Sequence, residues 1–353
     1  MPVHLHGLGT ALPPHVLDQS EVAARAADIF GGAYPQFDRL ARSFKTSGIE
    51  QRHSVVPIEW FEAPHGWGDR SAAYLKGARM LFVQAVSAAL SDAGWSAKDV
   101  DCVVTVSTTG IATPSLEAQV FGEMGFRGDV MRVPVFGLGC AGGVSGLGTA
   151  EALARSGMRV LLVVVETCSL AFRADRMQKA DIIAAVLFGD GAAAACLGPE
   201  APVGPGRTCI TLGAGHQKIW PDTLEIMGWD VDDAGLGVVF DRSIPGFVAE
   251  HFAGATAGAL NAAGLTTGNI DRYVCHPGGA KVVTAIEEAL NLTAGTLDSE
   301  RDVLRRCGNM SAPTVLFVLQ SVLASGATGQ MMACALGPGF TASFLPLHIG
   351  GIG

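Results

Sequence analysis

Residues 89–107, ALSDAGWSAKDVDCVVTVS, recur in outline at residues 259–277, ALNAAGLTTGNIDRYVCHP. Identical residues lie at a fixed offset of 170 positions without a gap, and these are Ala89, Leu90, Ala93, Gly94 and Asp101, which match Ala259, Leu260, Ala263, Gly264 and Asp271. Each copy is typical of a helix end, a glycine that stops the helix, a short loop and a buried strand. Two copies separated by about half of the chain predict a protein built from two similar halves.

Strand patterns alternate with helix patterns on both sides of this repeat. We expect strands at 101–107, 131–136, 158–165 and 192–197, then at 271–276 and 331–335, with helices at 70–93, 142–156, 245–263 and 312–325. Such alternation predicts an α/β layered fold. No Pro/Gly/Ser-rich linker separates the halves, so we expect them to pack together with a site between them.

Composition narrows the class of protein. The 353 residues are 49% apolar and 16% charged, which is typical of a large packed core. A net charge of −9 argues against a nucleic-acid partner. The N-terminal residues lack the pattern of a signal peptide, and the longest apolar run, 158–165, is far shorter than the roughly 20 residues that span a bilayer.

The eight cysteines form no C-x-x-C pair, which argues against a zinc site. Most of them lie in apolar stretches, where a reduced cysteine behaves as a small hydrophobic residue. We therefore expect no metal site and a cytoplasmic location.

One cysteine has an unusual setting. In 134-PVFGLGCAGGVSGLGTA-150, Cys140 lies between an apolar strand and a helix of small residues. The positive end of a helix dipole lowers the pKa of a nearby thiol, and the flanking glycines allow a ligand to approach closely. Cys140 is therefore a candidate nucleophile, with a buried core cysteine at a tight turn as the alternative.

Two further residues suit that nucleophile. His276 ends the strand of the second half and is followed by Pro-Gly-Gly, at the edge where α/β folds place ligands. Asn309 lies just before an apolar helix; taken alone, either it or Ser311 is equally well a helix cap. Together, a thiolate beside an imidazolium, with His and Asn as donors to an oxyanion, predict acyl transfer.

These residues fall in five short motifs: G-C-A-G-G at 139–143, L-F-G-D-G-A at 187–192, H-P-G-G at 276–279, G-N-M-S at 308–311 and G-P-G-F at 337–340. In this order and spacing the chain resembles the type III polyketide synthases, the chalcone-synthase-like branch of the thiolase superfamily. The resemblance implies a thiolase-like fold, in which two similar halves form α-β-α-β-α layers. We place the nucleophile half at 1–200 and the half that carries His and Asn at 201–353.

The resemblance also implies roles. Cys140 takes the starter acyl group from a coenzyme A thioester, His276 keeps it as thiolate, and His276 with Asn309 holds malonyl-CoA while CO2 leaves. Phe188 corresponds to a gate phenylalanine, with a core phenylalanine as the alternative. The other residues implied in the gate and cavity are Leu187, Thr108, Thr113, Glu166, Cys168, Ala171, Trp229, Val238, Ser311 and Pro338.

Coenzyme A is expected at a basic helix in the N-terminal region. Arg39 and Arg42 share one face at i, i+3 spacing, where their charges attract phosphates, although a solvated basic face is the alternative. By resemblance the coenzyme A site also includes Lys45, Thr46, Gly278 and Gly279. The thioesters are substrates, and no further cofactor is implied.

The chain departs from the plant pattern in the cavity. Val238 replaces a second gate phenylalanine, Ala171 a threonine, Trp229 a glycine and Ala335 the first glycine of the G-x-G-P-G loop; a one-residue slip would place Gly228 where we place Trp229. The smaller Val and Ala side chains leave more space in the cavity, whereas the Trp side chain fills space. The shape of the cavity therefore differs from that of the plant enzymes. Segments 107–118 and 221–231 most resemble bacterial alkylpyrone and alkylresorcinol synthases, which implies long acyl starters and two or three malonyl units.

Other readings stay open. A ketoacyl-ACP synthase of the initiating type would condense once and take malonyl from a carrier protein. A cysteine thioester hydrolase would deliver water to the acyl group. A catalytically silent scaffold protein would need no thiolate. The resemblance further implies a homodimer, in which the partner subunit contributes the residue corresponding to Thr113 to the cavity. An acyl carrier protein as starter donor is left open.

Overall fold

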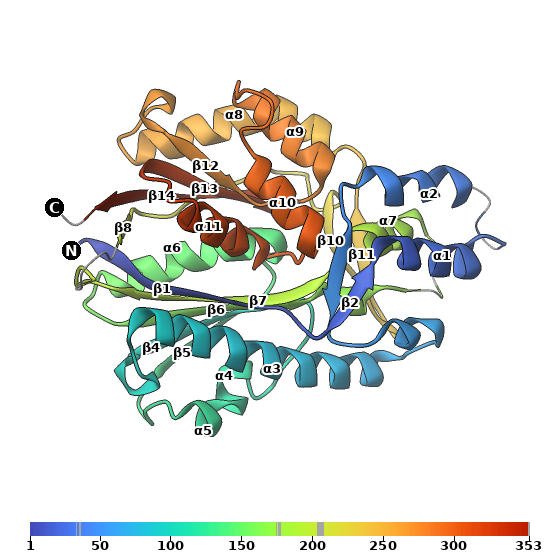
Figure 1. Ribbon diagram of the computed structural model, residues 1–353, viewed down its shortest axis with the longest axis horizontal. Helices are drawn as coiled ribbons and strands as arrows, with labels where there is room; N and C mark the ends of the chain where they lie inside the picture. The colour runs from blue at the N-terminus through green and yellow to red at the C-terminus, as the bar shows by residue number, and fades with distance from the viewer. Residues whose placement is uncertain (33, 35–36, 174, 176–177, 203–207, 352–353) are drawn as a thin grey trace.

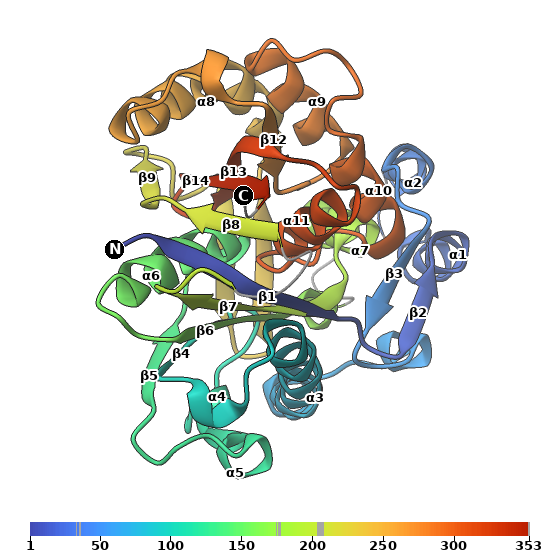
Figure 2. The ribbon, with the colours of Figure 1, turned by 60° about the vertical axis from the view of Figure 1, so that its left-hand side comes forward.

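The computed structural model describes residues 1–32, 34, 37–173, 175, 178–202 and 208–351, in which layers of helices alternate with layers of strands (Figures 1 and 2). The first half contains β1 Val3–Ala11, β2 His15–Asp18, α1 Gln19–Phe30, α2 Phe37–Thr46, β3 Gln51–Ser54, η1 Ile58–Glu62, α3 Trp67–Ala93, η2 Ala97–Asp99, β4 Cys102–Val106, α4 Leu116–Gln119, α5 Phe121–Met124, β5 Met131–Val135, η3 Gly139–Ala141, α6 Gly142–Ala154, β6 Val160–Thr167, η4 Cys168–Ala171, α7 Lys179–Leu187 and β7 Asp190–Gly198.

The second half contains β8 Thr208–Leu212, β9 His216–Ile219, β10 Met227–Asp232, β11 Gly235–Phe240, α8 Ile244–Ala262, η5 Thr267–Asn269, β12 Arg272–Cys275, α9 Ala280–Ala289, α10 Asp298–Cys307, α11 Thr314–Ala324, β13 Gly329–Gly337 and β14 Thr341–Gly351. All ten helices and strands expected from the sequence are present, with ends that differ by a few residues. Strand β13 is longer than expected because its pairing with β14 extends from Gly329 to Gly337.

Hydrogen bonds join the strands of both halves into one 10-stranded sheet in the order β12-β13-β14-β8-β1-β7-β6-β4-β5, with β9 on β14. Strand β1 connects the halves, because it pairs with β7 on one side and with β8 on the other. Parallel β4, β5 and β6 end at the edge where the Cys140 turn begins.

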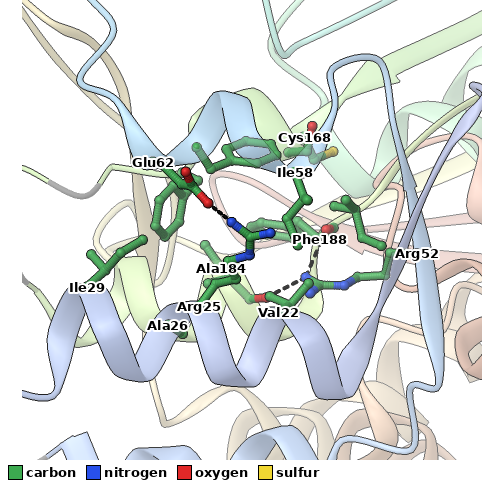
Figure 3. A pocket seen from close by; sticks show the side chains of 15 residues that line it. Val22, Arg25, Ala26, Ile29, Arg52, Ile58, Glu62, Cys168, Ala184 and Phe188 are labelled. Atoms are coloured by element: carbon green, nitrogen blue, oxygen red, sulfur yellow. Dashed lines mark hydrogen bonds and ion pairs between the residues drawn. The ribbon is translucent and has the colours of Figure 1, made fainter.

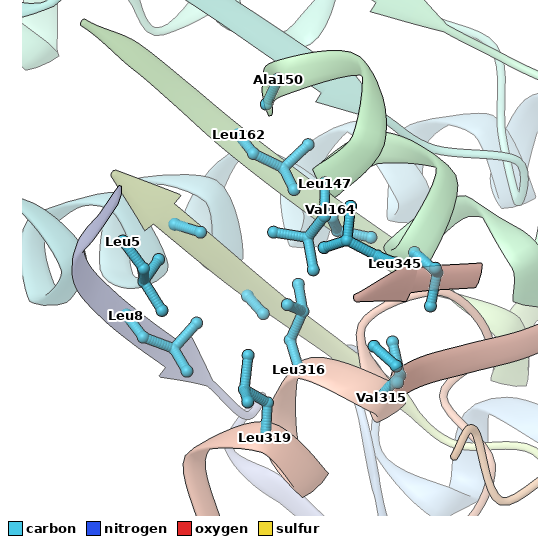
Figure 4. Close-up of a cluster of buried hydrophobic side chains, with 14 of the residues drawn as sticks. Leu5, Leu8, Leu147, Ala150, Leu162, Val164, Val315, Leu316, Leu319 and Leu345 are labelled. Atoms are coloured by element: carbon cyan, nitrogen blue, oxygen red, sulfur yellow. The ribbon is translucent and has the colours of Figure 1, made fainter. Parts of the chain in front are cut away.

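Buried residues alternate between two faces of each central strand. In β6, Leu162 and Val164 face α6 and α11 in the middle layer, while Leu161 and Val163 face the outer helix α3 (Figures 2 and 4). Strand β13 does the same, with Ala333 toward the middle layer and Cys334 toward the cluster formed with α8 and α9. Two-sided burial explains why these strands read as continuous apolar runs, and it gives the α-β-α-β-α layers of a thiolase-like fold.

The repeat is visible in detail. Gly94 and Gly264 both end a helix with positive φ, at 68° and 70°. Each is followed by a short 3-10 helix with a capping box, formed by Ser96 with Asp99 and by Thr266 with Asn269. The predicted internal duplication is therefore present as the same run of backbone conformations in both halves.

Candidate active site

Cys140 lies in the 3-10 helix η3, directly before α6. The turn is pressed against the G-P-G-F loop of the second half, because a Cβ atom on Gly139, whose φ is +46°, would lie 2.6 Å from Cδ of Pro338. A Cβ atom on Gly337 would lie 2.6 Å from Cβ of Ala141. Glycine at both positions lets the two halves meet at the cysteine.

A buried carboxyl group supports the turn from behind. The Gly139 amide donates to Oγ1 of Thr108 at 3.1 Å. The Thr108 amide donates to the Glu166 carboxylate at 2.9 Å, and the amide and hydroxyl of Thr109 donate to it as well. Burial raises the pKa of Glu166 to about 7, although these hydrogen bonds act in the opposite direction. Thr108 and Glu166, both expected in the cavity, thus fix the loop that carries Cys140.

Asn309 connects three motifs through its backbone and side chain. Its amide donates to the Leu187 carbonyl at 2.8 Å, and its carbonyl accepts from the Gly189 amide at 3.0 Å. Its Nδ2 donates to the Gly278 carbonyl at 3.1 Å, and its Oδ1 accepts from the Ser311 amide at 2.7 Å. Ser311 has a φ of +60°, a conformation that costs a non-glycine residue energy and is common at functional sites.

His276 follows β12 and is 4% exposed. Its amide donates to the Cys334 carbonyl at 2.8 Å, which continues the pairing of the strand beyond Cys275. Both ring nitrogens are buried without a hydrogen-bond partner in the part of the chain that the structure describes. Burial lowers the pKa of the ring to about 3. An imidazole with two unused nitrogens can bond to a substrate.

The expected effect of the helix dipole on Cys140 is wrong in direction. Burial raises the pKa of the thiol to about 11, while hydrogen bonds from the side chains of Ser311 and Asn309 act to lower it. Cys140 is 8% exposed, and the loss of hydration is the largest cause of this shift. Because burial disfavours charge on both Cys140 and His276, the thiolate forms only where attraction to the imidazolium offsets both desolvation costs.

Several residues expected at the gate and cavity form a small cluster, called the gate cluster below. Ala171, Ala184 and Val238 pack together, with Phe188 and Trp229 against them. Trp229 and Val238 are paired on the β10–β11 hairpin, and Nε1 of Trp229 donates to the Thr108 carbonyl at 2.9 Å.

The alternative alignment of this position places Gly228 at the cavity. A Cβ atom on Gly228 would meet nothing within 4 Å, whereas Trp229 contacts the gate cluster. Trp229 is therefore the residue that faces it. Cys168 lies in η4 together with Ala171. Burial raises the pKa of its thiol, and the charges of Glu166, Asp190 and Cys140 raise it further.

A large open cavity adjoins this centre, with about 750 Å³ accessible to water-sized molecules. Of the residues expected to bind coenzyme A, Arg39, Thr46, Gly278 and Gly279 line it, and so does Leu187. Arg42 and Lys45 are exposed and are not among its lining residues.

Three basic residues of this cavity were missed from the sequence: Lys179, Arg242 and Lys281. Lys281 is the second residue after the H-P-G-G motif, and this closeness was an available signal. Lys179 and Arg242 come from segments that only the fold brings to the cavity. Thr113, by contrast, is exposed in a loop beside Ile111 and is not among the residues that line the cavity of this chain.

Two negative findings apply to the described residues. No group of three or more His, Cys, Asp or Glu side chains there is arranged to hold a metal ion. Over the same ranges, no helix combines the length and the apolarity that a bilayer crossing requires.

Comparisons with known proteins agree with this geometry. Residues 2–201 match the family of chalcone and stilbene synthases, N-terminal domain, and residues 211–348 match its C-terminal domain. The chain is 40% identical over 350 residues to 1,3,6,8-tetrahydroxynaphthalene synthase of Streptomyces peucetius subsp. caesius, covering 96% of this chain and 91% of that protein. It is 28% identical to the alpha-pyrone synthesis polyketide synthase-like Pks18 of Mycobacterium tuberculosis, covering 96% and 88%.

Among solved structures, 1,3,6,8-tetrahydroxynaphthalene synthase from Streptomyces coelicolor A3(2), a bacterial type III polyketide synthase, superposes with a TM-score of 0.92 at 26% identity, covering 99% of both chains. Both halves, both family domains and nearly the full length of these relatives are thus represented. The chain belongs to the chalcone and stilbene synthase family and is a type III polyketide synthase, an acyltransferase that condenses coenzyme A thioesters.

Proposed function

We propose that Cys140, His276 and Asn309 are the catalytic residues of this synthase, the first from the half at 1–200 and the others from the half at 201–353. The observation that carries the proposal is the buried imidazole of His276 with two unpartnered nitrogens. It lies beside the loop whose Gly278 carbonyl accepts from Asn309, and the side chain of Asn309 acts to lower the pKa of the Cys140 thiol.

Loading balances as a thioester exchange. The Cys140 thiol attacks the carbonyl of the starter thioester, and its proton passes to His276. The tetrahedral intermediate collapses as the bond to the coenzyme A sulfur breaks, and that sulfur leaves with the proton. His276 is therefore the proton acceptor that a thiol with a pKa of about 11 requires near neutral pH.

Extension follows on the same residues. Malonyl-CoA loses CO2, and the electron pair of the broken C–C bond becomes an enolate whose oxygen accepts hydrogen bonds from His276 and from the second Nδ2 hydrogen of Asn309. The enolate carbon attacks the acyl group on Cys140, the C–S bond breaks, and the cysteine is free for another round. The cycle requires no group beyond the coenzyme A thioesters.

For the product we propose alkylpyrones or alkylresorcinols, made from long acyl starters with two or three malonyl units. The small side chains of Ala171, Ala184 and Val238 at the gate and the resemblance to a protein named for alpha-pyrone synthesis support this choice. Each CH2 of a starter buried along such a surface contributes about 0.8 kcal/mol.

A second candidate product is a hydroxylated naphthalene, favoured by the 40% identical relative named for one. The ten carbons of a naphthalene skeleton equal five two-carbon units, so this route needs no long starter. Trp229, which fills space at the gate cluster, limits how far a long chain could bend there.

Mass spectrometry of products tests both candidates. The protein would be incubated with malonyl-CoA alone and with acyl-CoA starters from acetyl to stearoyl, beside a Cys140→Ala control. Cyclic tri- or tetraketides from long starters, absent in the control, support the first product. A naphthalene from malonyl-CoA alone supports the second. One condensation that depends on carrier-protein-bound malonyl, or hydrolysis alone, would overturn both. An arm with acyl carrier protein as starter donor tests that route.

We also propose a homodimer in the cytoplasm. Strand β5 is the edge of the sheet, and three large apolar side chains lie exposed on it or near it: Ile111, Met131 and Phe136. Thr113 lies in the same region. In a symmetric dimer formed through this region, Thr113 of one subunit would reach the cavity of the other. All eight cysteines are free, which suits a reducing compartment.

A further inference from the structure

One wall of the gate cluster stands apart from the large sheet. Strands β10 and β11 form a two-stranded sheet of their own. Trp229 and Val238 lie directly opposite each other on this hairpin, and both pack in the gate cluster. A two-stranded hairpin has little stability by itself, so contacts with other elements must hold these two side chains in place.

The opposite wall is held by a buried arginine. Arg52 is 2% exposed, and its Nη1 donates to the carbonyls of Ala185 and Phe188, near the end of α7 (Figure 3). The space behind Phe188 and Ala184 holds only about 60 Å³. The backbone of this wall is thus fixed and its side chains have little room to retreat, so the hairpin is the wall that can change the shape of the gate cluster.

A second buried arginine joins the tip of the hairpin to the rest of the cluster. Arg173 is 2% exposed and follows Ala171 by two residues. Its Nη1 donates to Oδ1 of Asp232 at 2.8 Å, and its Nη2 donates to Oδ2 at 3.3 Å. Asp232 ends β10, three residues after Trp229. Two charge-assisted hydrogen bonds therefore connect the hairpin to the segment that carries Ala171.

Arg173 has another carboxylate partner, which belongs to its own segment. Its Nε and Nη2 donate to the two oxygens of Asp175 at 2.7 and 2.6 Å. Removing the charge of one aspartate therefore leaves the guanidinium paired with the other, which avoids the cost of an unpaired buried charge. The two aspartates form a matched pair, because only Asp232 lies on the hairpin.

The tip of the hairpin also rests on Arg70 of α3. A Cβ atom on Gly235 would lie 3.1 Å from Cδ of Arg70. Nη1 of Arg70 donates to the carbonyls of Leu170 and Phe172. Both arginines thus place the tip beside η4 and the residues that follow it, and Arg173 does so through opposite charges.

The contact between Arg173 and Asp232 is present at neutral pH. The hydrogen bond from Arg173 and those from the Ala234 and Gly235 amides lower the pKa of Asp232 to about 2. A carboxyl group with a lowered pKa loses its contribution only as the pH falls toward that value. The pair is therefore a permanent contact and not a switch in the range where the synthase works.

We propose that Arg173 is a positioning residue for the length of the product. Through Asp232 it holds Trp229 and Val238 against Ala171, and the space left at the gate cluster limits the number of malonyl units. The proposal rests on the synthase function proposed above. It adds a determinant that acts through the hairpin and not by touching the growing chain.

Matched substitutions at the two aspartates test whether the contact holds the hairpin. Asp232→Asn keeps an oxygen that can accept from the Ala234 and Gly235 amides but loses the charge that faces Arg173. In hydrogen–deuterium exchange, we expect the amides of 227–240 to exchange about fivefold faster in this variant. Asp175→Asn should exchange there at the wild-type rate. This measurement requires no product.

The product profile tests the role in chain length. With malonyl-CoA and one acyl-CoA starter, we expect the share of products with one more malonyl unit to rise about threefold in Asp232→Asn and to stay unchanged in Asp175→Asn. Arg173→Met combined with Asp232→Asn should add nothing to the effect of Asp232→Asn, because both substitutions remove the same contact. If Arg173→Met does not fold, the two aspartate variants still decide.

Two exchange results would overturn the contact as the restraint on the hairpin: an unchanged rate in Asp232→Asn, or equal acceleration in both aspartate variants. Faster exchange with an unchanged product profile would overturn the role in chain length. A wild-type protein that makes no polyketide from any starter would overturn the proposed function and this role together, whereas the exchange rates would still show whether Arg173 holds the hairpin.

Discussion

At the scale of single residues, glycine decides where Cys140 lies. Gly139 and Gly137 both have positive φ, at 46° and 92°, but only a Cβ on Gly139 would collide with Pro338. We expect Gly139→Ala to lower kcat at least 100-fold, because the displaced turn carries Cys140 with it. Gly137→Ala, which has no such contact, should cost about 1 kcal/mol of stability and keep most of the activity. Steady-state kinetics and urea unfolding measure both, and an active Gly139→Ala enzyme would show that the contact does not position the thiol.

Trp229 sets the space at the gate cluster. Its indole packs against the cluster of Ala171, Ala184 and Val238 and donates a hydrogen bond to the Thr108 carbonyl. Trp229→Gly removes this bulk, so we expect products with at least one more malonyl unit, detected by mass spectrometry of the reaction. Val231→Gly, on the same hairpin but exposed, is the control. An unchanged product profile in Trp229→Gly would remove Trp229 from the determinants of chain length.

At the scale of elements, a buried carboxyl joins α10 to β12. Glu300 is buried and accepts a hydrogen bond from the Cys275 amide at 2.9 Å. Its Oε2 has no hydrogen-bond partner among the described residues and lies 4.0 Å from Nη2 of Arg272. Burial raises its pKa to about 7. The folded chain therefore holds a proton that the unfolded chain has lost, so the stabilising contribution is complete below pH 4.5 and disappears as the pH rises to 7.

Glu300→Gln should not show this loss. We expect the free energy of unfolding of the wild type to fall relative to the variant by about 3 kcal/mol between pH 4.5 and pH 7, measured by urea denaturation. Glu287 is the control of opposite sign, because Arg301 holds its pKa below its usual range. Its contribution is present above the ordinary pKa and is lost as the pH falls. Parallel curves for the wild type and Glu300→Gln would contradict the raised pKa.

Element order was predictable because its signals are local. The helix ends at Gly94 and Gly264 and the capping boxes after them follow from neighbouring residues alone. The direction of the pKa shift of Cys140 was not predictable, since it depends on burial by loops that are distant in sequence. The same holds for the cavity at Arg39, which the fold assembles from segments as distant in sequence as Lys179, Arg242 and Gly278.

At the scale of the whole molecule, exposed apolar residues on two different strands allow the position of a dimer interface to be tested. Ile111 is 58% exposed near the edge strand β5, and Ile219 is 62% exposed on β9. If β5 is the dimer interface, Ile111→Asp should convert a dimer to a monomer in light scattering, whereas Ile219→Asp should not. A charge in a closely packed interface is costly. A wild-type monomer, or equal effects of the two substitutions, would place the interface elsewhere or remove it.

The place of β1 in the sheet affects how the chain is made. This strand bonds to β7 and β8, which end at Gly198 and Leu212. A ribosome adding roughly 5–20 residues per second needs on the order of 10 to 40 seconds between β1 and these partners. During that interval an apolar strand waits with both edges open in the nascent chain. The strand that unites the two halves therefore exposes unpaired backbone groups for the longest time during translation, and we expect chaperones to bind it.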